Sequence, residues 1–165
     1  MYLDSKLLKP GARMTSSASL PDRLGSVGYL TNWAARLLAR TMDERLRPLG
    51  LSSGQLPVFF ALAGGDELTQ RDLARLAGIE QPTMAATLAR MDRDGLVSRR
   101  PDPRDGRSAL IRLTQEAMEK VPGVVGAVAT VNGQALSGFG EGEADHLRSM
   151  LLRVTANLGD TEGER

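Results

Sequence analysis

Two arginines and two carboxylates alternate within six residues, in the sequence Asp-Pro-Arg-Asp-Gly-Arg from Asp102 to Arg107. Guanidinium groups on a turn that contains proline and glycine are suited to binding phosphates and base edges. We expect Arg104 at the tip, where the negative potential of a DNA minor groove would attract it. Asp102 and Asp105 would hold Arg104 or Arg107 by fork-shaped hydrogen bonds. The alternative is a charged turn that neutralises itself.

A second polar set precedes this turn. A helix is predicted to begin with Pro82 in its first turn and to end near Asp94. Met84, Leu88 and Met91 share its apolar face, and polar side chains lie on the other faces. Such side chains offer hydrogen bonds to base edges or phosphates, although they also suit an ordinary solvated face. The residues that we assign to DNA binding on this helix are Gln81, Pro82, Thr83, Thr87 and Arg90.

The elements around these residues fit together as a winged helix. Thr69 is a predicted helix cap, with the Asp72 carboxylate at the third position, and Gly78 separates this short helix from the next one. Residues 95–100 and 108–113 have the pattern of short strands, so the turn between them is the tip of a basic hairpin. The sequence therefore predicts a mainly α fold with a small β-wing, and a winged helix-turn-helix DNA-binding lobe over 51–114.

Long amphipathic helices flank this lobe. One is predicted near 23–48, and a Ser52–Gln55 capping box opens the next helix, through about Ala63. Thr114 begins a helix that we expect to bend or break within about two residues of Pro122. A last amphipathic helix carries Leu147, Met150, Leu151, Val154 and Leu158.

The apolar faces of these helices exceed what one lobe can cover. We therefore assign 21–50 and 115–158 to a dimerisation region and expect an obligate homodimer. Residues 1–20 are predicted to be a mobile tail, and 159–165 a frayed end.

Charge and composition narrow the function further. Residues 68–113 contain nine basic and six acidic residues, whereas 114–165 contain four and eight, so the basic excess coincides with the hairpin. The chain has no cysteine and only one histidine, His146, which we interpret as a surface or interface residue. No catalytic set, phosphate-binding loop, metal cluster or cofactor motif is recognisable, and no apolar run approaches the ~20 residues of a membrane span. These features predict a cytoplasmic protein that is not an enzyme.

The hairpin with its flanks resembles the signature of the MarR family of bacterial transcription regulators. The matching positions are Gly95-Leu96-Val97, Arg99, the Asp102-x-Arg104-Asp105-x-Arg107 core and Ile111-x-Leu113-Thr114. The resemblance covers about residues 25–158 and implies a homodimer that binds a pseudo-palindromic operator on double-stranded DNA, most often as a repressor. It also implies release of DNA by small aromatic acids or phenols. Pro122-Gly123 departs from the family pattern, where this helix is usually long and uninterrupted.

An effector site would need an apolar pocket and, for an acid, a cation. Tyr29, Trp33, Phe59 and Phe60 are candidate lining residues, with Arg36 as a candidate anion partner. The alternative is that these rings fill the core and that Arg36 is solvated. Two rival functions also stay open: a winged-helix protein–protein interaction module without specific DNA binding, and a small enzyme. The absence of a nucleophile–base pair argues against the enzyme.

Overall fold

A computed structural model describes residues 22–159. The tail expected at 1–20 lies outside the described residues, and of the end expected at 159–165 only Gly159 is described. The chain divides into two compact units between Ala34 and Ala35, within helix α1 (Val27–Leu46). No helix in the described range is long and apolar enough to cross a bilayer.

The described part of the first unit, residues 22–34, contains a short 3-10 helix, η2 (Arg23–Gly25), and the first turns of α1. The Ser26 hydroxyl accepts a hydrogen bond from the Tyr29 backbone N–H (3.3 Å), which satisfies one of the free donors at the start of α1. Tyr29 and Trp33 are one helical turn apart, and their ring centroids are separated by 6.2 Å.

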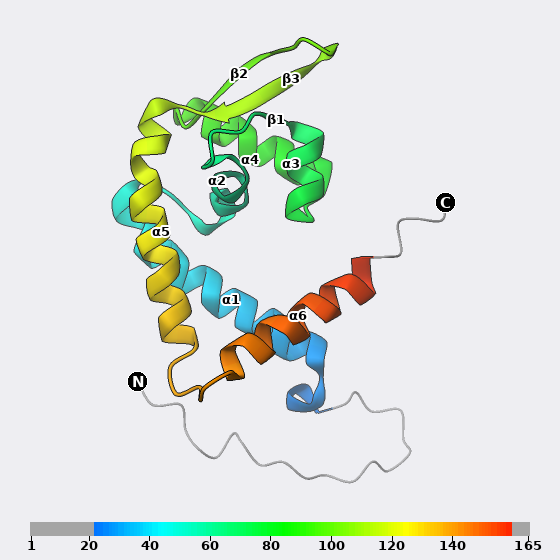
Figure 1. The fold of residues 1–165 in the computed structure, drawn as a ribbon, viewed down its shortest axis with the longest axis vertical. Coiled ribbons are helices and arrows are strands. Elements are labelled where there is room, and N and C mark those ends of the chain that lie inside the picture. The colour runs from blue at the N-terminus through cyan, green and yellow to red at the C-terminus, as the bar shows by residue number, and fades with distance from the viewer. Residues whose placement is uncertain (1–21, 160–165) are drawn as a thin grey trace. The chain divides into compact units, whose positions relative to one another are not determined.

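The second unit combines helices with one small sheet. Its three strands are antiparallel in the order β1-β3-β2, and α2, α3 and α4 lie below them in Figure 1. The fold prediction, mainly α with a small β-wing, is therefore confirmed. In chain order, its elements after α1 are η3 (Arg47–Leu49), η4 (Ser53–Gln55), α2 (Leu56–Leu62), β1 (Leu68–Thr69), α3 (Gln70–Ala77), α4 (Gln81–Arg93), β2 (Val97–Asp102), β3 (Asp105–Leu113), α5 (Gln115–Ala135) and α6 (Glu143–Gly159).

Hydrogen-bonding caps start these helices where the sequence predicts them. Ser52 and Gln55 form the expected capping box ahead of α2, although the first turn is 3-10 rather than α. The Thr69 hydroxyl accepts from the Asp72 N–H (3.1 Å) and donates to the Asp72 carboxylate (2.7 Å), which fixes the start of α3. The Thr114 hydroxyl accepts from the Ala117 N–H (3.2 Å) at the start of α5. Each cap satisfies donors that the helix itself leaves unpaired.

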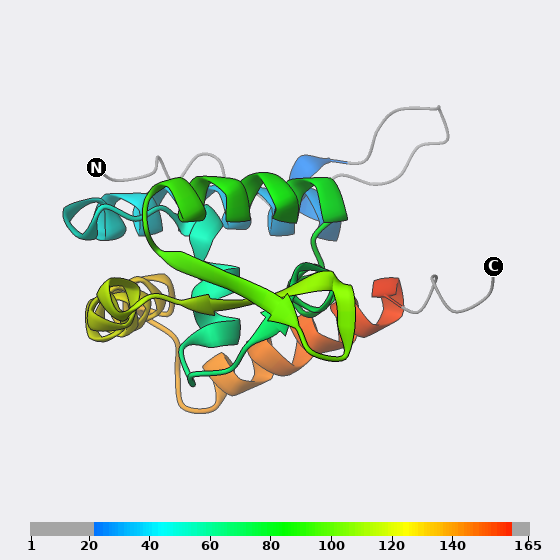
Figure 2. The same ribbon diagram turned by 90° about the horizontal axis from the view of Figure 1, so that it is seen from above.

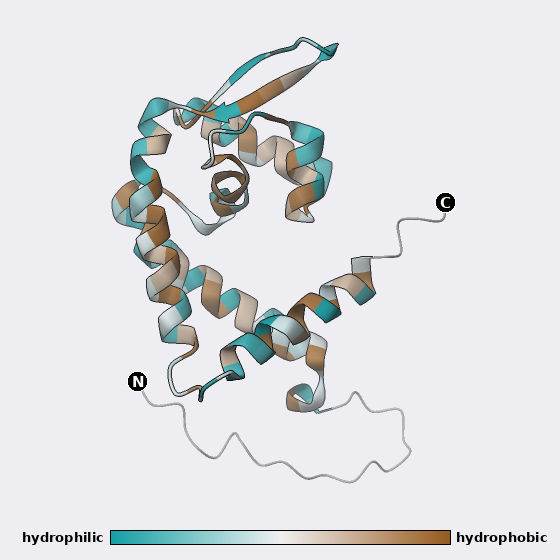
Figure 3. Cartoon of the chain, viewed as in Figure 1, coloured by the Kyte–Doolittle hydropathy of each residue, from teal (hydrophilic) through white to brown (hydrophobic). Residues whose placement is uncertain are grey.

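A continuous hydrophobic core holds the lobe together. It joins the end of α1, the helices α2, α3 and α4, the base of the sheet and one face of α5. Leu46, Val58, Leu62, Leu88 and Ile111 are fully buried within it. In Figure 3 hydrophobic colour fills the interior of the lobe, whereas the tip of the β2–β3 ribbon is hydrophilic.

Helix α5 corrects one prediction. Of the two expected outcomes, a break near Pro122 is wrong, because α5 is continuous from Gln115 to Ala135 with Pro122 inside it, whereas a bend stays a prediction. Proline removes only one helical hydrogen bond, and α5 is held on both sides of Pro122 by buried Ala117 and Val124. At the next residue, a side chain on Gly123 would place its Cβ 3.0 Å from both terminal carbons of Leu49, so glycine permits close packing there.

Candidate nucleic-acid interface

The helix-turn-helix is formed by α3 and α4. Gly78 ends α3 in the left-handed conformation (φ +60°), which glycine adopts without strain. The chain then turns at Ile79, whose N–H donates to the Ala74 carbonyl (3.0 Å), and α4 begins at Gln81. The turn therefore presents the first residues of α4 at a helix N-terminus, the part of a recognition helix that reads base edges.

One face of α4 packs into the lobe and the opposite face is open. Met84, Leu88 and Met91 are at most 1% exposed, as the spacing predicts. The exposed side chains of α4 include two hydrogen-bonding groups in its first turn and a guanidinium group farther along. The exposed residues among those that we selected are Gln81, Pro82, Thr83 and Arg90.

Thr87 does not belong to this open face. Its side chain is 6% exposed, and its hydroxyl accepts a hydrogen bond from the Arg90 guanidinium (3.3 Å). The expectation that Thr87 points outward is wrong, because it lies three residues after Met84 and four before Met91, on the buried face. Its contact orients Arg90 instead.

The wing is the β2–β3 hairpin. Val97 pairs with Leu113 and Pro101 with Ala109, but the next pair is Asp102 with Asp105. Residues 106–108 of β3 therefore have no pairing partner on β2, and Arg107 lies in this bulge. Proline has no N–H to donate to a ladder, which fits an irregularity beside Pro101. Figure 2 shows the hairpin from above, with α4 running alongside it.

The two wing carboxylates bind backbone rather than guanidinium groups. Asp102 accepts from the Arg104 N–H (2.9 Å), and Asp105 accepts from the Arg107 N–H (3.0 Å) and from the Ser108 hydroxyl (2.8 Å). The expected fork-shaped pairs with Arg104 or Arg107 are therefore wrong. Short aspartate side chains reach their own backbone two residues on more readily than an arginine head. The Arg107 N–H, followed by the Ser108 hydroxyl, lowers the pKa of Asp105, so this carboxylate stays ionised.

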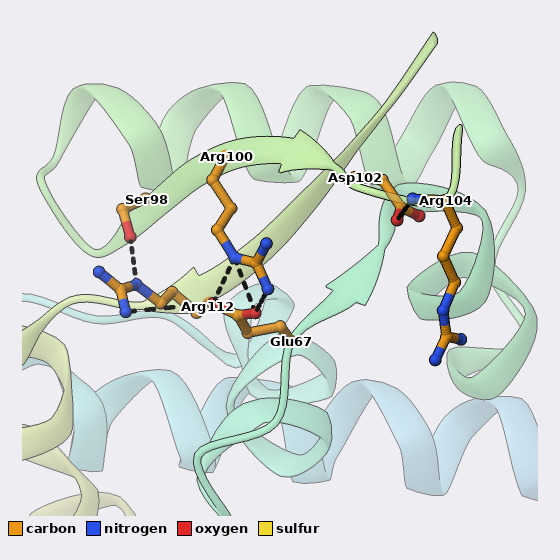
Figure 4. A network of polar contacts seen from close by, with 6 residues as sticks. All are labelled: Glu67, Ser98, Arg100, Asp102, Arg104 and Arg112. Carbon is orange, nitrogen blue, oxygen red and sulfur yellow. Dashed lines mark hydrogen bonds and ion pairs between the residues drawn. The ribbon is translucent and has the colours of Figure 1, made fainter. Parts of the chain in front are cut away.

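Arg104 and Arg107 are both exposed on the wing. Within residues 22–159 neither guanidinium group forms an ion pair. In Figure 4 Arg104 extends away from the contacts at the base of the wing and carries no dashed line beyond its backbone bond to Asp102. The two aspartates thus fix the backbone of the tip, and the guanidinium groups of Arg104 and Arg107 stay exposed.

A polar cluster at the base of the wing was missed by sequence reasoning. Glu67, just before β1, accepts a hydrogen bond from the Arg100 Nε–H, which both carboxylate oxygens share (3.0 and 2.9 Å), and a further short one from Nη2. The Arg112 Nη1 atom lies 4.0 Å from the same carboxylate, and the Arg112 Nε atom donates to the Ser98 hydroxyl (3.2 Å). We call Glu67, Ser98, Arg100 and Arg112 the Glu67 cluster (Figure 4).

The strand register is the signal that would have revealed this cluster. Leu68 pairs with Ile111, so Glu67 lies beside Arg112, which itself pairs with Ser98. Glu67, Arg112 and Ser98 therefore lie in one row, and Arg100 follows two residues after Ser98 on the same face of β2. A two-residue strand such as β1 leaves too short a pattern to recognise in the sequence.

The aromatic residues selected for an effector site separate into two groups. Phe59 and Phe60 line an apolar pocket of about 290 Å³, which also includes Val121 and Val125 of α5. Arg36 is exposed and is not among the residues that line this pocket. Tyr29 and Trp33 belong to the first unit and contact each other there.

The remaining candidates for chemistry are the single histidine and clusters of metal-binding side chains. His146 is exposed on α6, as expected for a surface or interface residue. Among residues 22–159, no three His, Cys, Asp or Glu side chains are placed to hold a metal ion.

Comparison with known proteins decides the family. Residues 49–108, which include the helix-turn-helix and most of the wing, match the model of the MarR family. The chain is 31% identical over 125 residues to the uncharacterised HTH-type transcriptional regulator YwoH of Bacillus subtilis (strain 168), covering 74% of this chain and 90% of that protein. This chain belongs to the MarR family. It is a DNA-binding, winged helix-turn-helix transcriptional regulator.

Solved structures agree with the fold of this MarR family member. A probable transcriptional regulator from Pseudomonas aeruginosa superimposes with a TM-score of 0.72 at 27% identity, over 79% of this chain and 97% of that one. The transcriptional repressor CouR, solved on a 23-mer DNA duplex, gives a TM-score of 0.74 at 24% identity, over 85% and 99%. MarR family proteins are regulators rather than enzymes, which argues against the rival reading as a small enzyme.

Proposed function

We propose that the chain represses transcription as a homodimer on a pseudo-palindromic operator, with α4 in the major groove and the wing in the minor groove. The observation that carries the proposal is the pairing of an open α4 face with a wing tip whose Arg104 forms no ion pair among the described residues. CouR, which shares the fold, was solved bound to a DNA duplex, and this supports double-stranded DNA as the partner.

Each exposed side chain then has a role. Gln81 and Thr83, in the first turn of α4, read base edges, and Arg90 binds phosphate or guanine. Arg104 enters the minor groove, and Arg107 binds the adjacent backbone. Asp102 and Asp105 do not approach phosphates; they hold the tip in shape through its backbone.

The dimer is proposed from apolar surface that one chain leaves open. No residue of α6 is buried, and its apolar side chains are open to solvent. Met150, Leu151 and Leu158 are 42%, 42% and 72% exposed. Large exposed apolar faces mark association surfaces. A two-fold dimer would place two recognition helices about one DNA turn apart, roughly 34–36 Å, on the two halves of a palindrome.

A small-molecule effector is the remaining part of the proposal. Among residues 22–159, the pocket that Phe59 and Phe60 line has only Phe, Val and Ala side chains around it, so it suits an apolar ring. These lining residues include no cation, and burying an unpaired carboxylate is costly, so an uncharged phenolic compound fits better than an aromatic acid. Titration of the protein–operator complex with phenol and with benzoate distinguishes the two, with release of the operator as the measured signal.

The decisive experiment is to sequence the DNA that the protein retains from its own genome, and then to measure affinity for that DNA and for random duplex at several salt concentrations. The proposal expects an enriched two-fold symmetric site and tighter binding to it at every salt concentration. Retention without any enriched site, with weak binding that salt abolishes, would support the rival protein–protein module instead.

A further inference from the structure

The wing has few anchors to the rest of the lobe. Ile111 is fully buried where it pairs with Arg99, but none of the residues from Arg99 to the tip and back to Leu110 is buried. A two-stranded ribbon is marginally stable by itself. The direction in which it carries Arg104 is therefore set by contacts at its base.

Glu67 provides the strongest of these contacts. Its carboxylate binds Arg100 of β2 through both oxygen atoms and lies within 4.0 Å of Arg112 of β3, so one side chain joins both strands of the ribbon. The Glu67 side chain is 23% exposed, against 49% for Arg100. Bidentate, charge-assisted contacts fix geometry as well as adding stability.

The segment that begins with Glu67 also contacts both helices of the helix-turn-helix. Two residues on, Thr69 and Asp72 fix the start of α3. Between them, the Gln70 amide lies 3.5 Å from the side-chain oxygen of Gln81, the first residue of α4. Residues 67–72 thus contact the wing, α3 and the DNA-facing end of α4.

The opposite face of the ribbon is held less firmly. Arg99 and Asp92 of α4 approach to 3.7 Å, with 35% and 52% of their side chains exposed. An exposed pair at this distance adds little. Glu67 is therefore the contact whose loss should free the ribbon most.

We propose that Glu67 is a positioning residue for DNA binding, which sets the direction of the wing so that Arg104 enters the minor groove while α4 occupies the major groove. The inference rests on the DNA interface proposed above. The competing role for Glu67 is neutralisation. In this role it only offsets the positive charge of Arg100 and Arg112, and it affects neither the direction of the wing nor the sequence specificity of DNA binding.

The two roles predict opposite changes in DNA affinity when the Glu67 charge is removed. Removing a negative charge beside a DNA-binding surface strengthens binding to any DNA if charge alone matters. Releasing the wing weakens binding to the operator, because Arg104 must then be ordered as the complex forms. Glu67→Gln separates them, since the amide keeps the size of the side chain.

The affinity test compares Glu67→Gln with Asp66→Asn, in wild-type and Arg104→Ala backgrounds, on the retained operator. Asp66 is an exposed neighbour without an ion pair in the described part of the chain, so it matches the charge change. We expect Glu67→Gln to lose about five- to tenfold in affinity, Asp66→Asn to lose nothing, and the Glu67→Gln loss largely to disappear when Arg104 is absent.

Tighter or unchanged binding of Glu67→Gln would overturn positioning in favour of neutralisation. An equal loss in both backgrounds would also overturn it, because Glu67 would then act elsewhere than through the wing tip.

Hydrogen exchange tests the same role without DNA. The ribbon amides between Arg99 and Ile111 should exchange about three- to tenfold faster in Glu67→Gln than in Asp66→Asn, while the core amides of α4 stay unchanged. If the wild type bound no DNA but exchange responded in this way, the proposed DNA interface would fail and the anchoring by Glu67 would stand. Unchanged exchange would overturn the anchoring itself.

Discussion

The winged lobe and the last helix of this chain use hydrophobic residues in opposite ways. In the lobe, helix α4 buries Met84, Leu88 and Met91 almost completely within its own chain. In α6 a comparable apolar face has no buried residue. Figure 3 shows hydrophobic turns alternating with polar ones along α6. The lobe is therefore complete in one chain, whereas α6 has a surface that a second copy is proposed to cover.

The largest effect should follow from placing charge on the apolar face of α6. Leu151→Lys with Leu158→Lys puts two ammonium groups, seven residues apart, on this face. Wild type should sediment at twice the chain mass of 17.7 kDa and the variant at the single-chain mass. Operator affinity should fall about 100-fold, because two linked half-site contacts become one.

Ser149→Lys with Ala156→Lys is the matched control. It adds the same two charges on the opposite side of α6, at exposed positions, and should remain dimeric. If the wild-type chain sediments as a folded monomer, the proposal that a second copy covers α6 is wrong. The proposal of a palindromic operator then fails as well.

The next effect belongs to the core of the lobe. Leu88 is fully buried, so Leu88→Ala should lower the free energy of unfolding by about 2–5 kcal/mol. Leu76→Ala, at a position 59% exposed on α3, should change it by less than about 0.5 kcal/mol. Denaturant unfolding followed by circular dichroism measures both variants. Similar losses in the two would mean that the buried face of α4 is wrongly assigned.

Sequence reasoning succeeded in the lobe because its signals are local. Thr69, Ser52 and Thr114 each reveal a helix start through a partner three residues away. The apolar spacing of α4 similarly gives its buried face. For these elements the residue pattern and the three-dimensional contact involve the same few residues.

The failures involve contacts that a local pattern does not contain. Glu67 and Arg100 are separated by 33 residues, and their contact depends on a strand of two residues. Thr87 is polar yet lies within the buried face of α4. Pro122 disfavours a helix locally, but packing on both sides keeps α5 continuous. In each case tertiary packing outweighs the local preference of the residue.

A binding effect of moderate size is expected at the wing tip. Arg104→Ala should cost about 1–3 kcal/mol of operator binding and reduce the slope of log affinity against log salt by about one. Stability should change by less than about 0.5 kcal/mol, because the side chain is exposed. Arg153→Ala, which removes an exposed arginine from α6, is the control and should leave the operator affinity unchanged. Equal affinities of Arg104→Ala and wild type would reject the wing contact.

The smallest effect, and the finest test of the contrast, lies within α4 itself, between its open and its buried face. Gln81→Ala removes an exposed amide in the first turn, so the thermal midpoint should stay unchanged. If Gln81 reads a base edge, the variant should lose about 1–3 kcal/mol of discrimination at one base pair of each half-site and keep it elsewhere. Competition between operators substituted at single positions measures this.

A uniform loss across all operators would instead make Gln81 a phosphate contact, because phosphates carry no sequence information. The open face of α4 would then position the protein on DNA, and the reading of sequence would pass to Thr83 and Arg90.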